Sequence, residues 1–166
     1  MTSLEPINQV KLYGLGNYFK ELVELYRKDI YPNKLLLSGQ KGIGKSTLAY
    51  HFINYVLTLN EDFQYDYDNF EINANSKQFK TILNKSNTNL TTVDVTVEKK
   101  KIDINQIREL IINLNKSSFN NKCRFVLIDN IELLNINSIN ALLKILEEPN
   151  KNVYFILINN NKKIHS

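Results

Sequence analysis

Gly39-Gln40-Lys41-Gly42-Ile43-Gly44-Lys45-Ser46-Thr47 fits the phosphate-binding loop pattern G-x-x-x-x-G-K-[ST]. Three of the five glycines in the chain lie in this loop. Glycine suits the loop because backbone N–H groups must surround a phosphate at close range, in conformations that a Cβ would obstruct. The alternative is a chance match, which average glycine content gives in roughly one chain in a hundred or fewer of this length. The segment therefore predicts a site for the phosphates of a nucleotide.

The residues on either side of the loop predict a strand, a loop and a helix in succession. Residues 34–38 form a short apolar run that is typical of a buried parallel strand. Apolar residues then recur at helical spacing from Leu48 to Leu59. In this context Lys45 is expected to contact the β- and γ-phosphates, and Ser46 to offer its hydroxyl to Mg²⁺. The predicted ligand is ATP or ADP with Mg²⁺, held by the loop residues Gly39, Gln40, Lys41, Gly42, Ile43, Gly44, Lys45, Ser46 and Thr47.

Helices and strands alternate along the rest of the chain. Helices are predicted over residues 17–31, 103–114 and 139–146, and strands over residues 91–97, 124–129 and 153–158. Asn17 is expected to be the N-cap of the first of these helices, and Asp103 and Gln106 resemble a capping box at the start of the helix over 103–114. Residues 60–88 are polar and rich in Asn, with one short helix expected at 78–84. This order predicts an α/β protein, a three-layer αβα fold of the P-loop type with a parallel sheet, in one domain over residues 1–166.

The strand that ends at Asp129 resembles a Walker B strand, in which apolar residues precede a carboxylate. Asp129 is predicted to hold Mg²⁺ through the nucleotide, together with Ser46. Many buried strands end in Asp, so the pattern gains its meaning from the loop upstream. P-loop proteins that hydrolyse nucleotide usually carry Glu at the next position, where this chain has Asn130. Glu132, two residues farther along, is interpreted as an exposed charge at a helix start. An amide can hydrogen-bond water but cannot take its proton, so no catalytic residue is expected and hydrolysis should be weak or absent.

Asn159 ends the following apolar strand, and its spacing leaves two interpretations open. The side chain could reach the γ-phosphate or the water beside it, or it could belong to a turn made of Asn159, Asn160 and Asn161.

Composition excludes several other classes of protein. The net charge of +4 is too small to indicate nucleic-acid binding, and a solvated turn is the favoured interpretation of Lys99-Lys100-Lys101. No apolar run approaches the ~20 residues of a membrane span, and the N-terminus lacks the parts of a signal peptide, so we expect no membrane contact and a cytoplasmic location. A single cysteine, Cys123, excludes an internal disulfide and a cysteine-based zinc site.

Residues 140–149, N-A-L-L-K-I-L-E-E-P, resemble the N-A-L-L-K-x-L-E-E-P box of bacterial clamp loaders. These AAA+ proteins open the sliding clamp and place it on primed DNA. Residues 102–110 resemble the I-x-x-I-R-x-L helix of that family, and residues 36–39 lead into the loop as they do there. The resemblance covers nearly the whole chain except roughly residues 60–88.

Two clamp-loader subunits carry these boxes, the tau/gamma motor and the delta-prime stator. The motor has Asp-Glu in Walker B and four zinc cysteines after the P-loop helix, whereas this chain has Asp129-Asn130 and no such cysteines. The difference indicates the delta-prime type, a partner of delta and tau/gamma in the ring of the DNA polymerase III holoenzyme. Through that ring the partners would include the sliding clamp and primed DNA. By the same resemblance, Asn159 falls at sensor 1.

Two alternatives remain, an ATP-hydrolysing tau/gamma-type motor and a P-loop kinase for a small molecule. We find no basic lid or acceptor pocket for a kinase, which would also leave the E-E-P box unexplained.

The family also has a Ser-Arg-Cys motif, a last core strand, a helical lid and a collar domain, and none of these precedes Ser166. We therefore expect a fragment that holds the nucleotide-binding core alone. In such a fragment the strand over residues 34–38 would lie at an open edge of the sheet.

Overall fold

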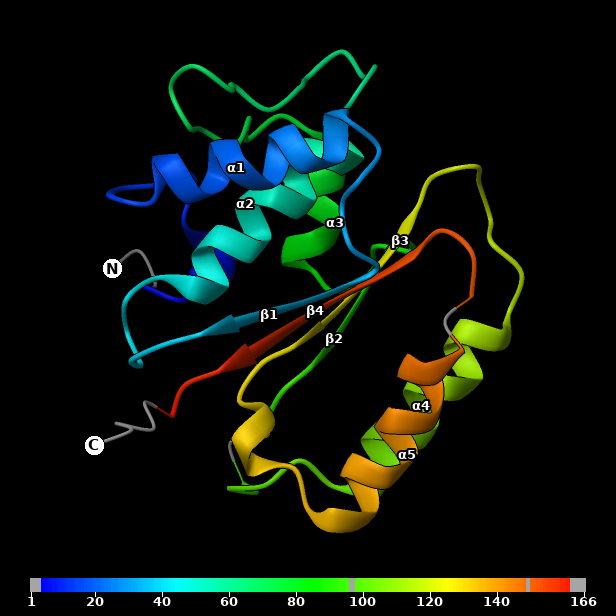
Figure 1. Cartoon of the computed structure of the whole chain (residues 1–166). Helices are drawn as coiled ribbons and strands as arrows, with labels where there is room; N and C mark the ends of the chain where they lie inside the picture. Colours follow the sequence, from blue (N-terminus) through cyan, green and yellow to red (C-terminus); the bar gives the residue numbers. More distant parts are fainter. Residues whose placement is uncertain (1–3, 96–97, 149, 162–166) are drawn as a thin grey trace. The chain divides into compact units, whose positions relative to one another are not determined.

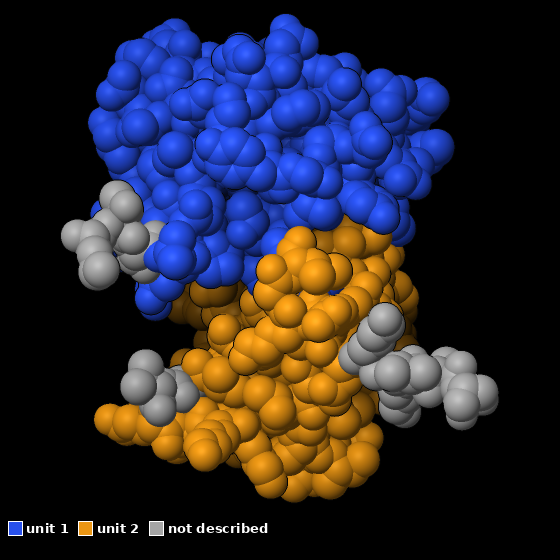
Figure 2. Space-filling view, turned by 90° about the vertical axis from the view of Figure 1, so that its left-hand side faces the viewer, with its two compact units in different colours: residues 1–32, 44–87 blue, residues 33–43, 88–166 orange. Residues whose placement is uncertain are grey.

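The computed structural model describes residues 4–95, 98–148 and 150–161. The chain divides into two compact units (Figure 2), of which unit 1 contains residues 1–32 and 44–87 and unit 2 contains residues 33–43 and 88–166. The predicted phosphate loop begins in unit 2 and ends in unit 1, because the chain changes units between Ile43 and Gly44. The single domain predicted over residues 1–166 stays a prediction.

Unit 2 is built on a parallel sheet of four strands (Figure 1). The strands lie in the order β1-β4-β3-β2, and every neighbouring pair is parallel. β3 and β4 occupy the centre because their side chains are apolar on both faces, whereas β1 and β2 alternate between apolar and polar or exposed positions. The predicted parallel α/β fold is confirmed. The strands span β1 Lys34–Ser38, β2 Leu90–Val93, β3 Arg124–Ile128 and β4 Val153–Asn159.

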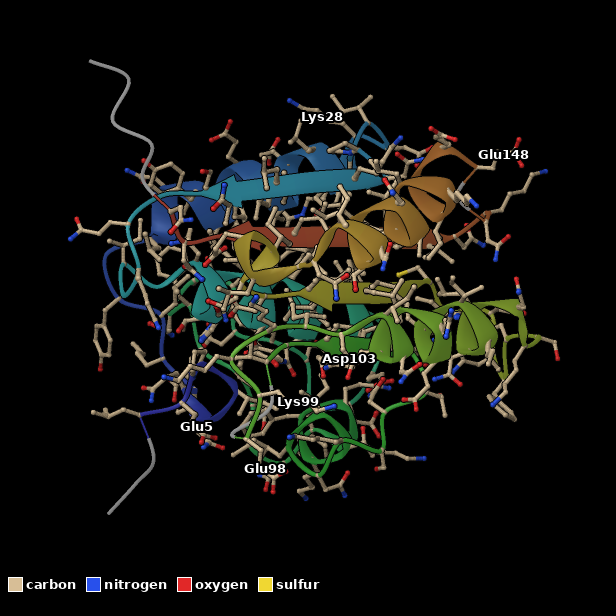
Figure 3. All side chains as sticks on the ribbon, turned by 90° about the horizontal axis from the view of Figure 1, so that it is seen from below. Glu5, Lys28, Glu98, Lys99, Asp103 and Glu148 are labelled. Atoms are coloured by element: carbon tan, nitrogen blue, oxygen red, sulfur yellow. The ribbon has the colours of Figure 1, made fainter. Side chains whose placement is uncertain are left out.

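Two helices of unit 2, α4 (Ile104–Asn115) and α5 (Ile136–Glu147), lie side by side and pack on the sheet (Figure 1). Their apolar faces form one core with β3 and β4. The predicted capping box of α4 is confirmed, since the Asp103 carboxylate accepts from the backbone N–H of Gln106 at 3.3 Å and the Gln106 side chain accepts from the N–H of Asp103 at 3.0 Å. Lys99 forms an ion pair with the same carboxylate at 2.8 Å (Figure 3).

Unit 1 contains the short η1 (Pro6–Asn8) and three helices, α1 (Gly16–Arg27), α2 (Lys45–Leu57) and α3 (Lys77–Leu83). Aromatic rings make up much of its core, with Phe19 stacked on Tyr65 at 5.0 Å and Tyr31 stacked on Phe52 at 4.8 Å between ring centroids. The Asn-rich segment therefore contributes to the core of unit 1, because it supplies the buried side chains of Tyr65, Ile72, Phe79 and Ile82.

Several element boundaries differ from the sequence-based prediction. β2 ends at Val93, not at residue 97, and residues 96–97 lie outside the described residues. Asn17 was predicted as the N-cap of α1, but the helix already begins at Gly16. α5 begins at Ile136, earlier than predicted, because the Asn135 side chain caps it by accepting from the N–H of Ser138 at 2.8 Å.

No helix among the described residues is long and apolar enough to cross a membrane.

Candidate functional site

Polar residues of unit 2 gather where the parallel strands end. Gly39 follows β1, Asp94 follows β2, Asp129 and Asn130 follow β3, and Asn159 ends β4. In open parallel sheets the carboxyl ends of the strands meet at one edge, which is where such folds bind ligands. The predicted site residues of unit 2 are therefore brought to a common edge.

The first half of the glycine loop leaves this edge directly after β1. The backbone N–H of Gly39 donates to the carbonyl of Asn159 at 3.2 Å, which fixes the start of the loop to the end of β4. Gln40, Lys41, Gly42 and Ile43 follow. Gly42 has a φ of 87°, a left-handed conformation that glycine adopts without strain, and a Cβ there would meet no atom within 4 Å. Glycine is thus required at Gly42 for its backbone conformation and not for space.

The second half of the loop lies in unit 1 and starts α2. Gly44 is the N-cap residue, with a φ of 94°, and Lys45, Ser46 and Thr47 form the first turn of the helix. A Cβ on Gly44 would lie 2.9 Å from the Leu15 side chain, so both space and conformation favour glycine. The helix N-terminus directs backbone N–H groups outward, and these favour an anion such as a phosphate. Lys45, in this first turn, is only 8% exposed.

Asn130 is the centre of a hydrogen-bond network at the carboxyl edge of unit 2. Its side-chain N–H donates to Asp94 Oδ1 at 2.7 Å, and its side-chain oxygen accepts from the amide of Asn160 at 2.8 Å. Its backbone has φ 54° and ψ 47°, the left-handed region that Asn tolerates better than most residues. Both ends of the amide are therefore held in place by neighbours.

Asp129 lies inside the same network. Its Oδ1 accepts from the backbone N–H of Asn130 at 2.7 Å and from the side chain of Asn160 at 3.1 Å. The backbone N–H of Asn160 in turn donates to Glu132 at 3.1 Å, in the short η2 (Ile131–Leu133). The sequence-based interpretation of Glu132 as an exposed charge at a helix start was wrong, because its carboxylate is half-buried and hydrogen-bonded to the end of β4.

Sequence reasoning therefore missed Asp94, Glu132 and Asn160 as members of the network. Asp94 was predicted inside a strand, and Asn160 was considered only as a turn residue. Asn159 contributes through its backbone carbonyl to Gly39, and its side chain accepts from the N–H of Asn161 at 3.0 Å. Its assignment to sensor 1 stays a prediction. A signal that could have found Asp94 is its place directly after a strand that precedes the Walker B strand.

The charges of unit 2 act on Asp94 from several sides. Loss of solvent around the carboxylate raises the pKa of Asp94 above its ordinary value, and the charge of Asp129 adds to the increase. The hydrogen bond from Asn130 and the charge of Lys41 act in the opposite direction. A third carboxylate beside Asp94 and Asp129 would increase the repulsion between negative charges at this edge. The neutral amide of Asn130 avoids this repulsion.

The magnesium ion predicted from the sequence would arrive with the nucleotide. Mg²⁺ prefers oxygen ligands and is usually held by one or two carboxylates together with phosphates and waters. Asp129 and Ser46 are the oxygen donors predicted for that role. Among the described residues, no group of three or more His, Cys, Asp or Glu side chains could hold a metal ion by itself. When bound, the ion would neutralise phosphate charge, and the loop N–H groups and Lys45 would bind and orient the phosphates.

A parallel α/β sheet with a glycine loop between its edge strand β1 and the N-terminus of α2 defines a protein of the P-loop class. A sequence model of the family described as "DNA polymerase III, delta subunit" matches residues 15–164, so the chain belongs to this family. The resemblance to DNA polymerase III subunits seen in the sequence is confirmed.

Individual relatives agree with this family. The chain is 30% identical over 151 residues to the DNA polymerase III subunit gamma/tau of Mycoplasma genitalium, covering 91% of this chain and 24% of the relative. It is 28% identical over 154 residues to the subunit delta' of Buchnera aphidicola subsp. Schizaphis graminum, covering 89% of this chain and 43% of the relative. The chain thus spans less than half the length of these relatives.

The fold is also similar to that of a solved structure. A DNA polymerase III gamma subunit-related protein from Thermotoga maritima superposes with a TM-score of 0.56 at 21% identity, covering 83% of this chain and 38% of that one. This likeness supports the fold of the chain.

Proposed function

We propose that the chain is the nucleotide-binding core of a DNA polymerase III clamp-loader subunit of the delta-prime type. It binds ATP or ADP with Mg²⁺ and hydrolyses ATP poorly or not at all. It acts in the cytoplasm beside delta and tau/gamma subunits, in a ring that loads the sliding clamp on primed DNA. The observation that carries this proposal is Asn130, the residue after the Walker B aspartate.

Asn130 is unsuited to activate a water molecule for two reasons. An amide has no basic lone pair that could take a proton at neutral pH. Its nitrogen and oxygen are moreover engaged with Asp94 and Asn160 at 2.7 and 2.8 Å. The carboxyl edge of the sheet therefore offers no general base at this position, and its proposed role is limited to binding and orienting phosphates.

The backbone at Asn130 agrees with this interpretation. A non-glycine residue in the left-handed region costs roughly 1 kcal/mol or more, and Asn pays less than Glu because its short side chain bonds locally. The φ of 54° thus favours Asn over the glutamate of hydrolysing P-loop proteins. The local conformation and the side chain both support a binding role.

A second candidate function is the ATP-hydrolysing tau/gamma-type motor. The observation that favours it is the 30% identity to the gamma/tau subunit of Mycoplasma genitalium. Asn130 and the single cysteine of the chain weigh against it. ATP turnover separates the two candidates, because a motor requires it and a stator does not.

The test combines calorimetric titration of ATP and ADP with a steady-state ATPase assay on the same preparation. Lys45→Ala is expected to weaken binding roughly ten- to hundredfold, because it removes a charge-assisted contact to the phosphates. Lys28→Ala is the matched control, since it removes an exposed lysine of the same unit that lies outside the loop. ATP turnover should stay near background in all three proteins.

Equal affinity in the wild type and Lys45→Ala would remove the nucleotide site from the proposal. Turnover of several per second would instead support the motor.

A further inference from the structure

Unit 2 has a cavity at the amino ends of β3 and β4, at the end of the sheet opposite to the carboxyl ends of the strands. It has a volume of about 600 Å³ and is lined by the start of β3, the residues before β4 and the loop between α4 and β3. Three lysines line it, Lys116, Lys122 and Lys151, and none of the described residues that line it is acidic. The sequence from Leu110 to Ile128 contains no Asp or Glu at all. The cavity therefore favours an anionic ligand.

An aromatic side chain lies beside this basic cavity. Phe119 is 84% exposed, and its two chain neighbours, Ser118 and Asn120, line the cavity. A phenyl ring in water loses the stabilisation that burial would give it, so a ring this exposed is available for a ligand to cover. Two of the lysines, Lys116 and Lys122, lie three positions before and after Phe119 in the chain. Lysines near an exposed aromatic ring match the combination that binds single-stranded nucleic acid, in which the bases stack on the ring and the lysines contact phosphates.

The loop that carries Phe119 is held in a defined conformation. Asn120 and the buried Asn89 exchange two side-chain hydrogen bonds, both of 2.9 Å, and Asn89 also donates to the carbonyl of Cys123 at 3.1 Å. Arg124 fixes the start of the loop, because its guanidinium donates to the carbonyls of Leu114 at 3.2 Å and Lys116 at 2.9 Å. A ligand would thus meet a loop that is already ordered, which lowers the entropic cost of binding.

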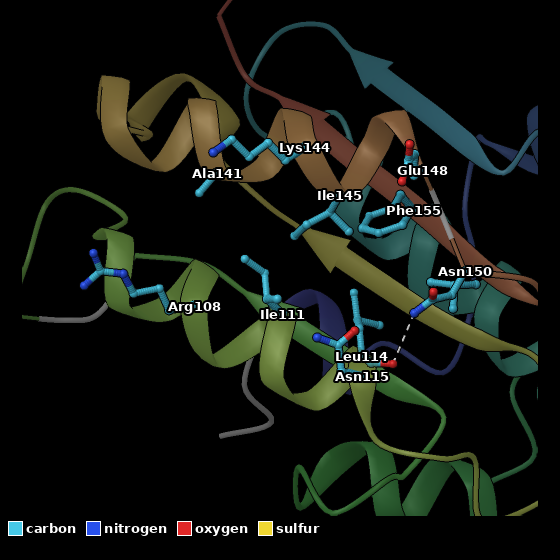
Figure 4. A pocket seen from close by; sticks show the side chains of 11 residues that line it. Arg108, Ile111, Leu114, Asn115, Ala141, Lys144, Ile145, Glu148, Asn150 and Phe155 are labelled. Carbon is cyan, nitrogen blue, oxygen red and sulfur yellow. Dashed lines mark hydrogen bonds between the residues drawn. The ribbon is translucent and has the colours of Figure 1, made fainter.

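A groove between α4 and α5 lies next to this cavity and, unlike the cavity, has an acidic lining residue (Figure 4). It has a volume of about 450 Å³, and its lining residues include the apolar Leu114 and Phe155 and a carboxylate, Glu148. Asn150 lines both cavities and donates to the carbonyl of Leu114 at 3.3 Å. The acid-free cavity beside Phe119 is the better match for a polyanion.

We propose that the loop between α4 and β3 binds single-stranded nucleic acid, with a base stacked on Phe119 and phosphates on Lys116, Lys122 and Lys151. Arg124 orders the loop and does not contact the ligand, because the helix carbonyls already occupy it. The site lies at the amino ends of β3 and β4, apart from the carboxyl edge of the same sheet. It is independent of nucleotide binding and goes beyond the proposed function.

The experiment measures the fluorescence anisotropy of a labelled oligothymidine of about 15 nucleotides with the full chain. Phe119→Ala is expected to weaken binding roughly five- to 150-fold. The triple variant Lys116→Gln, Lys122→Gln, Lys151→Gln should reduce the slope of log affinity against log salt by about 2, because each phosphate contact contributes about 0.7 on a single strand. The matched controls are Phe63→Ala, at another exposed phenylalanine, and the pair Lys100→Gln, Lys101→Gln; both should bind like the wild type.

Three results would overturn the proposal. The first is a wild-type chain that does not bind the oligonucleotide. The second is unchanged affinity in Phe119→Ala, which would leave only charge attraction to any polyanion. The third is competition by polyglutamate as effective as that by unlabelled oligothymidine, which would indicate an acidic protein partner. Circular dichroism verifies that each variant is folded, and Lys45→Ala, which affects the glycine loop, should retain oligonucleotide binding.

Discussion

The side chains around Asn130 show how a single residue sets the chemistry of a sheet edge. Asn130 lies between two carboxylates, Asp94 and Asp129, and donates to the first at 2.7 Å with its side chain and to the second at 2.7 Å with its backbone N–H. A glutamate at the same position would place a third negative charge beside them, in a left-handed conformation that suits it poorly. A glutamate at position 130 should therefore act better as a base when Asp94 is made neutral as well.

This argument predicts the outcome of a pair of variants. The double variant Asn130→Glu, Asp94→Asn should raise ATP turnover by on the order of 10²-fold, because it supplies a general base without the repulsion. Asn130→Glu alone should raise turnover less. The comparison is made by steady-state ATPase assay at saturating nucleotide.

The matched control is Asn130→Gln with Asp94→Asn, which has the same size but no carboxylate and should stay at background. If the double variant binds nucleotide normally and is as inactive as this control, the lack of hydrolysis has another origin than the base.

Strand β1 is one of the two edge strands of the sheet. It pairs with β4 on one side, and no strand among the described residues pairs with its other side. The described N-terminal residues pair within unit 1, where Leu12 N–H donates to the Phe70 carbonyl at 3.0 Å and Ile72 N–H to that of Val10 at 2.8 Å. The predicted open edge over residues 34–38 is therefore present. Leu36, 55% exposed, lies at its middle.

An open strand edge of this kind favours pairing with another chain. We expect the protein to self-associate through β1 and Leu36→Lys to reduce the association, since a charged edge residue opposes edge-to-edge pairing. Sedimentation velocity over a range of concentrations measures the association, and hydrogen exchange of residues 34–38 locates it.

Thr92→Lys on β2, the opposite edge strand, is the control and should leave association unchanged. A monodisperse monomer with fast exchange over residues 34–38 would contradict this prediction.

At the scale of the whole molecule, a buried histidine of unit 1 makes the stability of the protein depend on pH. Unit 1 buries His51, whose Nε2 lies 2.9 Å from the carbonyl of Gln9 and whose Nδ1 lies 2.7 Å from the hydroxyl of Tyr65. Because a carbonyl can only accept, Nε2 carries the proton and Nδ1 accepts from Tyr65. Burial lowers the pKa of His51 from 6.5 to about 4. The described residues of unit 2 contain no histidine.

This pKa predicts a loss of stability in acid. A lowered folded pKa means that the unfolded chain binds the proton first, so stability is complete above pH 6.5 and falls as the pH decreases towards 4. The loss should reach about 2 to 3 kcal/mol near pH 4. Urea unfolding at a series of pH values measures it, and hydrogen exchange should show the loss in α2 before the strands of unit 2.

His51→Gln provides the control, because it keeps a donor for Gln9 and cannot titrate in this range. A wild-type stability that is flat between pH 7 and 4.5, or identical pH dependence in this variant, would contradict the assignment to His51.

The sequence by itself determined the features that depend on near neighbours in the chain. Short spacings predicted the glycine loop, its flanking strand and helix, the capping box at Asp103 and the apolar strands over residues 34–38, 124–129 and 153–158. The structure has these strands within one residue of the predicted ends. These features rest on local backbone geometry and side-chain periodicity, which residues a few positions apart already define. Asp129 and Asn130 were located in the same way, because they directly follow an apolar strand.

Only the tertiary structure decided which distant residues meet. The strand order places Asp94 and Asn160 on either side of Asn130, although they are 36 and 30 positions away along the chain. The rings of Tyr65 and Phe19 meet in the same manner, which gives the polar segment 60–87 a core that its composition does not suggest. The physical reason is that such contacts depend on packing between elements, and the spacing of residues within one element carries no information about its neighbours.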